Sequence, residues 1–306
     1  MSEASKESLR GVASALAGYL LWGVLPLFWD RLAHIGPLEI ILHRVLWGAI
    51  VAWIWTLALR RSSARRVEAA ALWPDLRTTV WLSAAGLLVT LNWLAFVFAV
   101  TSGRTLDASL GYYMNPLVNV LLGMIFLHER LSRLQWAAVT SAAIGVTFLT
   151  VRLGVVPWIS LFLAVSFAFY GLLKKRNSLG PIHALAIELT PLAVVTAVLI
   201  ATNVIQGAGH FALGNPGDSA LLLTTGVVTV VPLLLFGYGA RRIKLADLGF
   251  LQYIAPSIMF VLAITVFGDP LEPDRLIAFA FVWAGLALYS FDAIRRGRKA
   301  ARAAAT

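Results

Sequence analysis

Residues 107–127 read DASLGYYMNPLVNVLLGMIFL, and residues 247–267 read DLGFLQYIAPSIMFVLAITVF. The two stretches align without a gap at an offset of 140 residues, and both place Asp, Tyr and Pro at the same positions. The alignment extends to glycines on either side, with Gly86 matched by Gly226 and Gly145 by Gly285. The second half of the chain therefore repeats the first.

The composition predicts that this repeat lies in a membrane. Of the 306 residues, 59% are hydrophobic and 13% are charged, against roughly 25% charged in a soluble domain. About 20 apolar residues are needed to cross a bilayer. The chain has ten such spans, at residues 11–29, 37–59, 78–100, 105–127, 134–151, 155–173, 181–203, 219–240, 245–267 and 275–294. The first lacks a small-residue cleavage site after it, so we interpret it as a retained span and not a signal peptide.

The basic residues predict the orientation of the spans. Of the 25 Lys and Arg residues, 20 fall on the terminal and loop segments of one side and 4 on the loops of the other, while Arg44 lies within a span. Cytoplasmic loops carry such an excess, so we expect both termini to face the cytoplasm. The net charge of +10 then reflects membrane topology, and we expect a lipid bilayer but no nucleic acid as a partner.

Each copy of the repeat contains five spans, at residues 1–152 and 153–306. Because five is odd, the second copy enters the membrane from the opposite side. The sequence thus predicts an all-α membrane protein of ten helices in two inverted repeats, an arrangement found in many secondary transporters. Near the start of spans two and seven the copies also align at an offset of 144, which pairs Pro37 with Pro181 and Arg44 with Glu188.

The duplicated pattern resembles the EamA family of the drug/metabolite transporter superfamily, and within it the RarD group. The matching segments are Gly18-Tyr19, Trp22-Gly23, His43-Arg44, Asn92-Trp93, the run from Ala108 to Arg130, Phe167 to Gly171, and Gly249 to Ile254. Typical members have Gly before the Glu-Arg pair, where this chain has His128. The resemblance implies a multi-pass transporter of the inner membrane with a central cavity.

Arg44 is the most costly side chain in the predicted spans. It lies about seven residues, near 10 Å, into span two. An Arg at the centre of a membrane helix costs on the order of 3 kcal/mol. We therefore expect it to face a polar cavity or a partner and to attract an anionic group such as a carboxylate. The alternative is a structural Arg that bonds to backbone carbonyls or extends to the interface.

Glu188 occupies the matching position in span seven. A carboxylate inside the membrane is a candidate for proton exchange, as the coupling site of a proton-driven transporter requires. A permanent ion pair between Glu188 and Arg44 that holds the two halves together is the alternative.

Span four carries a stripe of small and polar residues at every fourth position, which places them on one helix face. Gly111 and Gly123 favour close helix packing, whereas Asn115 and Asn119 are candidates both for packing and for substrate binding.

Aromatic and amide side chains recur at cavity depth and suit an amphipathic organic molecule. With Arg44, Asn115 and Asn119 they complete the predicted substrate site. They are Trp22, Asn92, Trp93, Tyr112, Tyr170, Gln252 and Tyr253.

The sequence offers little for other chemistry. The histidines have no partner at metal-ligand spacing, and there is no phosphate-binding Gly-rich loop, so we expect no metal, no cofactor and no ATP-driven step. We predict a secondary transporter, an exporter or permease, of small polar or amphipathic metabolites such as amino acids or drug-like compounds. A passive facilitator of the same fold is the alternative, and a membrane-embedded lipid-handling enzyme is disfavoured because clustered catalytic groups are missing. Substrate, direction and oligomeric state stay open.

Overall fold

The computed structural model describes residues 3–61, 73–102, 105–154, 158–176, 179–212, 215–268, 270 and 272–303. Within these ranges all regular elements are helices, and ten helical segments are long and apolar enough to cross a membrane. They coincide with the ten predicted spans to within a few residues at most ends, which confirms the all-α membrane fold.

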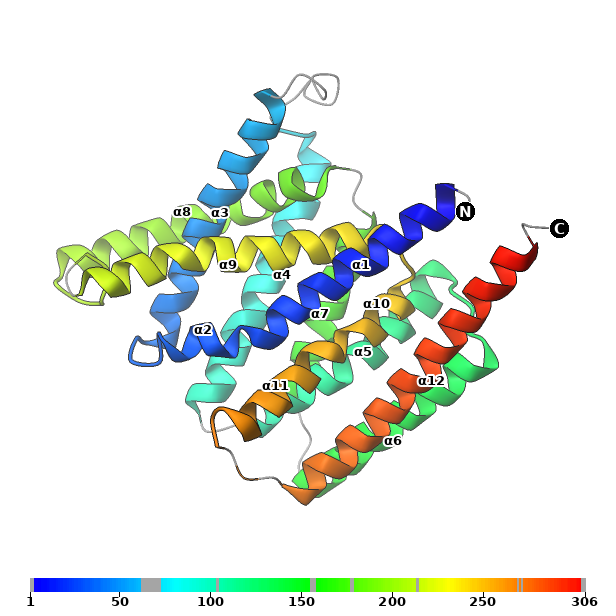
Figure 1. The fold of residues 1–306 in the computed structure, drawn as a ribbon. Coiled ribbons are helices and arrows are strands. Elements are labelled where there is room, and N and C mark those ends of the chain that lie inside the picture. Colours follow the sequence, from blue (N-terminus) through cyan, green and yellow to red (C-terminus); the bar gives the residue numbers. More distant parts are fainter. Residues whose placement is uncertain are drawn as a thin grey trace.

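The helices follow one another in an up-and-down bundle (Figure 1). The first half contains α1 (Glu3–Val24), α2 (Pro26–Asp30), α3 (Pro37–Arg61), α4 (Leu76–Thr101), α5 (Thr105–Leu127) and α6 (Arg133–Leu153). The second half contains α7 (Trp158–Arg176), α8 (Pro181–Ile205), α9 (Pro216–Ala240), α10 (Leu245–Gln252), α11 (Ile254–Thr265) and α12 (Pro273–Ala303).

Two of the predicted spans are broken helices. The first span divides at Leu25, where Pro26 begins α2, and the ninth divides at Tyr253 between α10 and α11. A proline lacks the N–H that would continue the helix and its ring crowds the preceding turn, and Pro256 follows the second break within the first turn of α11. Each of these two predicted spans is therefore made of two helical segments.

The packing partners of the helices come in matching pairs. Three helices contact their own counterpart in the other half, as α3 contacts α8, α5 contacts α10 and α6 contacts α12. The helix α4 packs on α7 and α8, and its counterpart α9 packs on α1 and α3. The contacts that one half makes with the other therefore recur when the two halves are exchanged.

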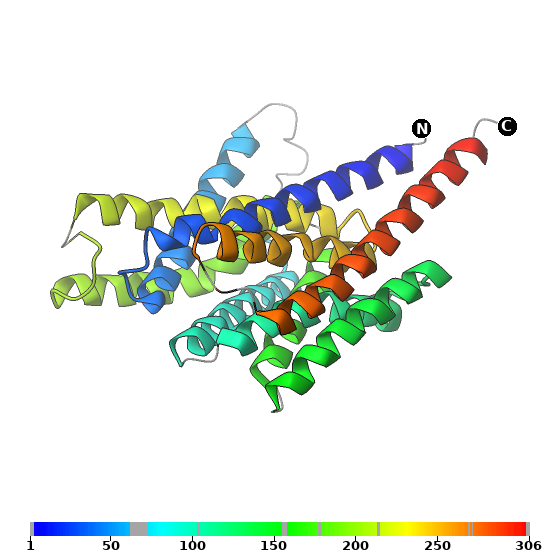
Figure 2. The same ribbon diagram turned by 60° about the horizontal axis from the view of Figure 1, so that its bottom comes forward.

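The pair α6 and α12 runs side by side along one edge of the bundle, as both ribbon views show (Figures 1 and 2). A Cβ on Gly145 would lie 2.8 Å from the carbonyl oxygen of Ala278, and one on Gly285 would lie 2.8 Å from that of Ala138. Because 138 and 278, like 145 and 285, differ by 140, the two glycines make the same contact in reverse. Both ends of the chain lie at one end of the bundle (Figure 2).

Candidate functional site

Arg44 is surrounded by side chains from three other helices. Its guanidinium carbon lies 4.9 Å from the ring centre of Trp29 on α2 and 4.3 Å from that of Trp93 on α4. Its Nε donates a hydrogen bond of 3.2 Å to Oγ1 of Thr229 on α9. A cation within about 6 Å of an indole centre is attracted by the ring, so both tryptophans stabilise the charge without neutralising it. The structure thus brings the predicted residues Arg44 and Trp93 together.

The terminal nitrogens of Arg44 have no hydrogen-bond or ion-pair partner among the described residues. The side chain is half-buried. A guanidinium carries five N–H donors in a planar fork that matches the two oxygens of a carboxylate. Because Nε donates to Thr229, the two terminal nitrogens of the guanidinium are available to bind an anion.

Tyr112, the fifth residue of this group, lies on α5. It is 38% exposed, although it sits within a membrane-spanning helix, and its ring meets that of Phe96 edge to face at 5.7 Å. Tyr112 and Arg44 lie within electrostatic range of each other. Arg44, Trp29, Trp93, Thr229 and Tyr112 are called the arginine site below.

Glu188 forms an ion pair with Lys174 and not with Arg44. Nζ of Lys174 lies 2.7 Å from one carboxylate oxygen of Glu188 and 2.8 Å from the other. The hydroxyl of Tyr170 also donates to this carboxylate, at 3.4 Å. The side chains of Glu188 and Lys174 are 0% and 4% exposed. This buried pair joins α7 to α8 and satisfies both oxygens, as a charge in a low-dielectric region requires.

Two further acid–histidine pairs lie where α3 and α9 begin. Glu39 accepts hydrogen bonds from the backbone N–H of His210, at 2.7 Å, and contacts the His210 ring at 3.0 Å. Asp218 contacts the His34 ring at 3.0 Å. Among the side chains that the structure describes, no three His, Asp or Glu residues gather in a way that could hold a metal ion.

The predicted amide residues are buried and bonded to protein atoms. Asn115 donates to the carbonyl of Ala164 at 2.7 Å, and Asn119 donates to Asn115 at 2.9 Å and to Gln252 at 3.1 Å. This chain of amides ties α5 to α7 and α10. Asn92 similarly joins α4 to α7, because it donates to the carbonyl of Leu163 and the hydroxyl of Ser166, both at 2.9 Å.

The remaining predicted aromatics belong to the packed interior. Trp22 and Tyr170 both contact Phe236, with ring centres 5.7 and 5.9 Å from it. The hydroxyl of Tyr253 donates to the carbonyl of Tyr113 at 3.1 Å. Together with the amides, these residues lie between helices, whereas Arg44 and Trp93 are partly buried and Tyr112 is exposed.

Three residues of these clusters were not singled out from the sequence. Thr229 lies on α9, which packs on α3, and Trp29 lies on the short helix α2. No local sequence pattern shows that either residue contacts Arg44. Lys174 lies in the basic run 174–176, which the charge count assigned to the membrane boundary. Lys174 could have been found by searching for a base to pair with Glu188, since an acid inside the membrane pairs with a base.

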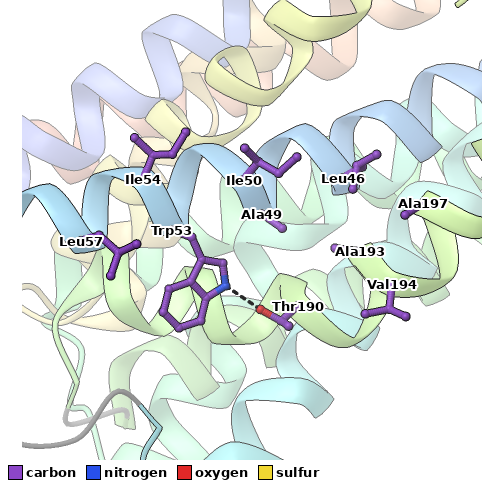
Figure 3. A pocket seen from close by; sticks show the side chains of 10 residues that line it. All are labelled: Leu46, Ala49, Ile50, Trp53, Ile54, Leu57, Thr190, Ala193, Val194 and Ala197. Carbon is purple, nitrogen blue, oxygen red and sulfur yellow. Dashed lines mark hydrogen bonds between the residues drawn. The ribbon is translucent and has the colours of Figure 1, made fainter.

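Apolar grooves lie elsewhere on the bundle. One of about 420 Å³ lies between α3 and α8, where Nε1 of Trp53 donates to Oγ1 of Thr190 at 2.8 Å (Figure 3). Another of about 570 Å³ lies between α4 and α7. None of the predicted substrate residues lines either groove, and their apolar walls suit lipid chains better than a polar solute.

Comparison with known proteins places these features in a group of membrane transporters. The model of the EamA-like transporter family matches residues 9–151. An uncharacterized transporter of Pseudomonas aeruginosa is 41% identical over 95% of this chain and 96% of its own. The protein RarD of Escherichia coli is 37% identical over 97% of this chain and 99% of its own.

A further relative and a solved structure extend the comparison. The uncharacterized transporter YojE of Bacillus subtilis is 37% identical over 94% of this chain and 96% of its own. One protein of known crystal structure superposes with a TM-score of 0.68 at 20% identity, over 94% of this chain and 97% of that one. At this identity the structural likeness speaks for the fold alone.

Proposed function

The chain belongs to the EamA-like transporter family and is a multi-pass transporter of the bacterial inner membrane, and we propose that it is a secondary-active carrier of small polar or amphipathic metabolites. It binds them at the arginine site and exposes that site alternately to the two sides of the membrane. We expect no enzymatic activity.

The proposed mechanism uses residues 1–152 and 153–306 as inverted repeats with both termini in the cytoplasm. The matched helix contacts, the reciprocal Gly145 and Gly285 contacts and the common end of the two termini support this arrangement. Two copies with the same contacts in opposite orientation can exchange conformations, which opens one side as the other closes.

Cysteine labelling tests the proposed orientation. The chain has no native cysteine, and a Cβ at Gly36 or Gly180 would meet no atom within 4 Å. In intact cells, Gly36→Cys should react with a membrane-impermeant maleimide from outside, and Gly180→Cys only after the inner face is opened. The opposite pattern would contradict the cytoplasmic placement of the termini.

The unpaired, oriented guanidinium of Arg44 is the observation that carries the substrate assignment. Arg44, Trp93 and Tyr112 are proposed as direct substrate contacts. Trp22, Asn92, Asn115, Asn119, Tyr170, Gln252 and Tyr253, which are bonded or packed between helices, are proposed to hold the walls of the substrate path.

Transport in proteoliposomes tests this assignment. We expect the protein to exchange at least one member of a panel of organic acids, amino acids and amphipathic aromatics, and Arg44→Gln to lower that rate more than about tenfold. Arg152→Gln is the matched control, because Arg152 pairs with exposed Asp274 at 2.8 Å and lies outside the arginine site. A folded Arg44→Gln protein that transports normally would reduce Arg44 to a structural residue.

Glu188 is proposed as the residue that couples transport to protons. In this scheme Lys174 balances the carboxylate when it carries no proton, and protonation of Glu188 breaks the ion pair. The two helices that the pair joins, α7 and α8, are then free to separate.

The double variant Lys174→Met/Glu188→Gln tests coupling without leaving an unpaired buried charge. We expect it to exchange substrate across equal pH but to lose acceleration by a pH gradient, with Glu188→Gln alone giving the same loss. A response to the gradient equal to that of the unmodified protein would contradict the coupling role.

A passive facilitator is the second candidate. Full burial of Glu188 and occupation of both its oxygens by Lys174 favour it, because a permanently paired carboxylate does not exchange protons. In that case the unmodified protein itself should show no acceleration by a pH gradient.

A further inference from the structure

Resting on the proposed transport function, we infer that the arginine site selects amphipathic aromatic carboxylates that carry no ammonium group, and discriminates against zwitterionic amino acids. The inference follows because the site supplies a partner for a carboxylate and an apolar ring but none for an ammonium group.

The orientation of Arg44 selects a carboxylate. Rings of Trp29 and Trp93 lie against the guanidinium, and Nε is bonded to Thr229. These three contacts fix the plane of the group and leave its two terminal nitrogens as parallel donors. Two parallel N–H groups at fixed spacing can donate to both oxygens of a carboxylate at once. A single neutral oxygen cannot accept both bonds with the same geometry.

No described acid near the site is free to bind an ammonium group. Both oxygens of Glu188 accept hydrogen bonds from Lys174. One oxygen of Glu39 accepts a hydrogen bond from the backbone N–H of His210, and the other contacts the His210 ring. Helix α4 carries no acidic residue between Leu76 and Thr101. Asp30, exposed beside Trp29 at the end of α2, is the remaining described acid close in sequence to a site residue.

The aromatic rings of the site do not replace this missing acid. The sides of Trp29 and Trp93 that face the site already hold the guanidinium. Tyr112 is exposed, but an ammonium placed against it would be repelled by Arg44, which lies within electrostatic range of Tyr112. The same surface, with Phe96 at its edge, suits the apolar ring of a substrate.

Three compounds with one phenylethyl skeleton separate the possibilities. 3-Phenylpropionate carries only the carboxylate, L-phenylalanine carries both charged groups, and phenethylamine carries only the ammonium. Binding to the full-length protein in lipid nanodiscs is measured by titration calorimetry at neutral pH. Counterflow in proteoliposomes is measured with the same three compounds.

We expect 3-phenylpropionate to bind at least about tenfold more tightly than phenylalanine, and phenethylamine not to compete. Arg44→Gln should abolish this preference, and Arg44→Lys should retain only part of it because a single ammonium cannot bind both oxygens at once. Asp30→Asn should leave the ranking unchanged.

Equal or tighter binding of phenylalanine, or binding of none of the three, would overturn the inference. A loss of phenylalanine binding in Asp30→Asn would identify Asp30 as the ammonium partner and overturn it as well. Each of these results can occur while the protein transports other metabolites, so failure of the selectivity is distinguishable from failure of the transport function.

Discussion

Arg44 and Glu188 occupy the same place in the two halves of the chain but have opposite surroundings. Each lies seven residues after the proline that begins its helix, α3 or α8. Glu188 is fully buried and both its oxygens are bonded to Lys174, whereas Arg44 is half-buried among neutral partners. A membrane-embedded charge must be compensated. In the second half, Lys174 neutralises Glu188. In the first half, Arg44 has no acidic partner among the described residues, so an anionic ligand can supply the counter-charge.

The largest expected effect is the loss of stability when the ion pair between Lys174 and Glu188 is broken. Lys174→Met leaves the Glu188 carboxylate buried without a counter-charge, which should cost about 3–5 kcal/mol of stability. Thermal unfolding of the purified protein in detergent measures it. The double variant Lys174→Met/Glu188→Gln is the control, and it should recover most of the loss. Equal losses in the single and double variants would show that the ion pair does not set the stability of this region.

A steric substitution tests whether the two regions also differ in packing. A Cβ on Gly86 would lie 2.0 Å from the carbonyl oxygen of Glu188, so Gly86→Ala must push α4 away from α8, at about 1–3 kcal/mol. Gly48, one turn after Arg44, is the matched control, because its Cβ would meet only side-chain methyl groups, of Leu189 at 3.3 Å and of Val230 at 3.8 Å. Similar melting temperatures for Gly86→Ala and Gly48→Ala would contradict this difference.

The smallest expected effect concerns the orientation of the guanidinium. Thr229→Val removes the acceptor of the Arg44 Nε–H, and the loss of one hydrogen bond of about 1 kcal/mol should weaken carboxylate binding several-fold. Titration calorimetry with 3-phenylpropionate measures it, and stability should change little. Thr224→Val, on an exposed part of the same helix, should leave the affinity unchanged. Equal affinity in both variants would remove Thr229 from the arginine site.

The sequence predicted the spans because the need for about 20 apolar residues is a local property of the chain. It did not predict that the first and ninth spans break at Leu25 and Tyr253. A proline inside a membrane helix is compatible with either a break or a continuous helix, and Pro116, Pro191 and Pro232 lie within continuous ones. Tertiary packing decides between the two outcomes.

Partners of the charged residues could be predicted only in part. The cost of a buried charge identified Arg44 and Glu188 as positions that need an explanation. Which residues supply it depends on contacts between distant helices, as between Arg44 and Thr229, which are 185 residues apart. Lys174 illustrates the limit, because a lysine at a span end has the same sequence pattern whether it extends to water or turns inward to an acid.

The reciprocal contacts of Gly145 and Gly285 link the steric limits of two distant positions. Each glycine admits a backbone carbonyl of the opposite copy, so a larger residue at either position separates the same two helices, α6 and α12. The spacing of one helix pair thus depends on two positions that lie 140 residues apart in the chain. A large side chain is therefore excluded at both positions for the same steric reason, whereas positions 44 and 188 carry opposite charges in different surroundings.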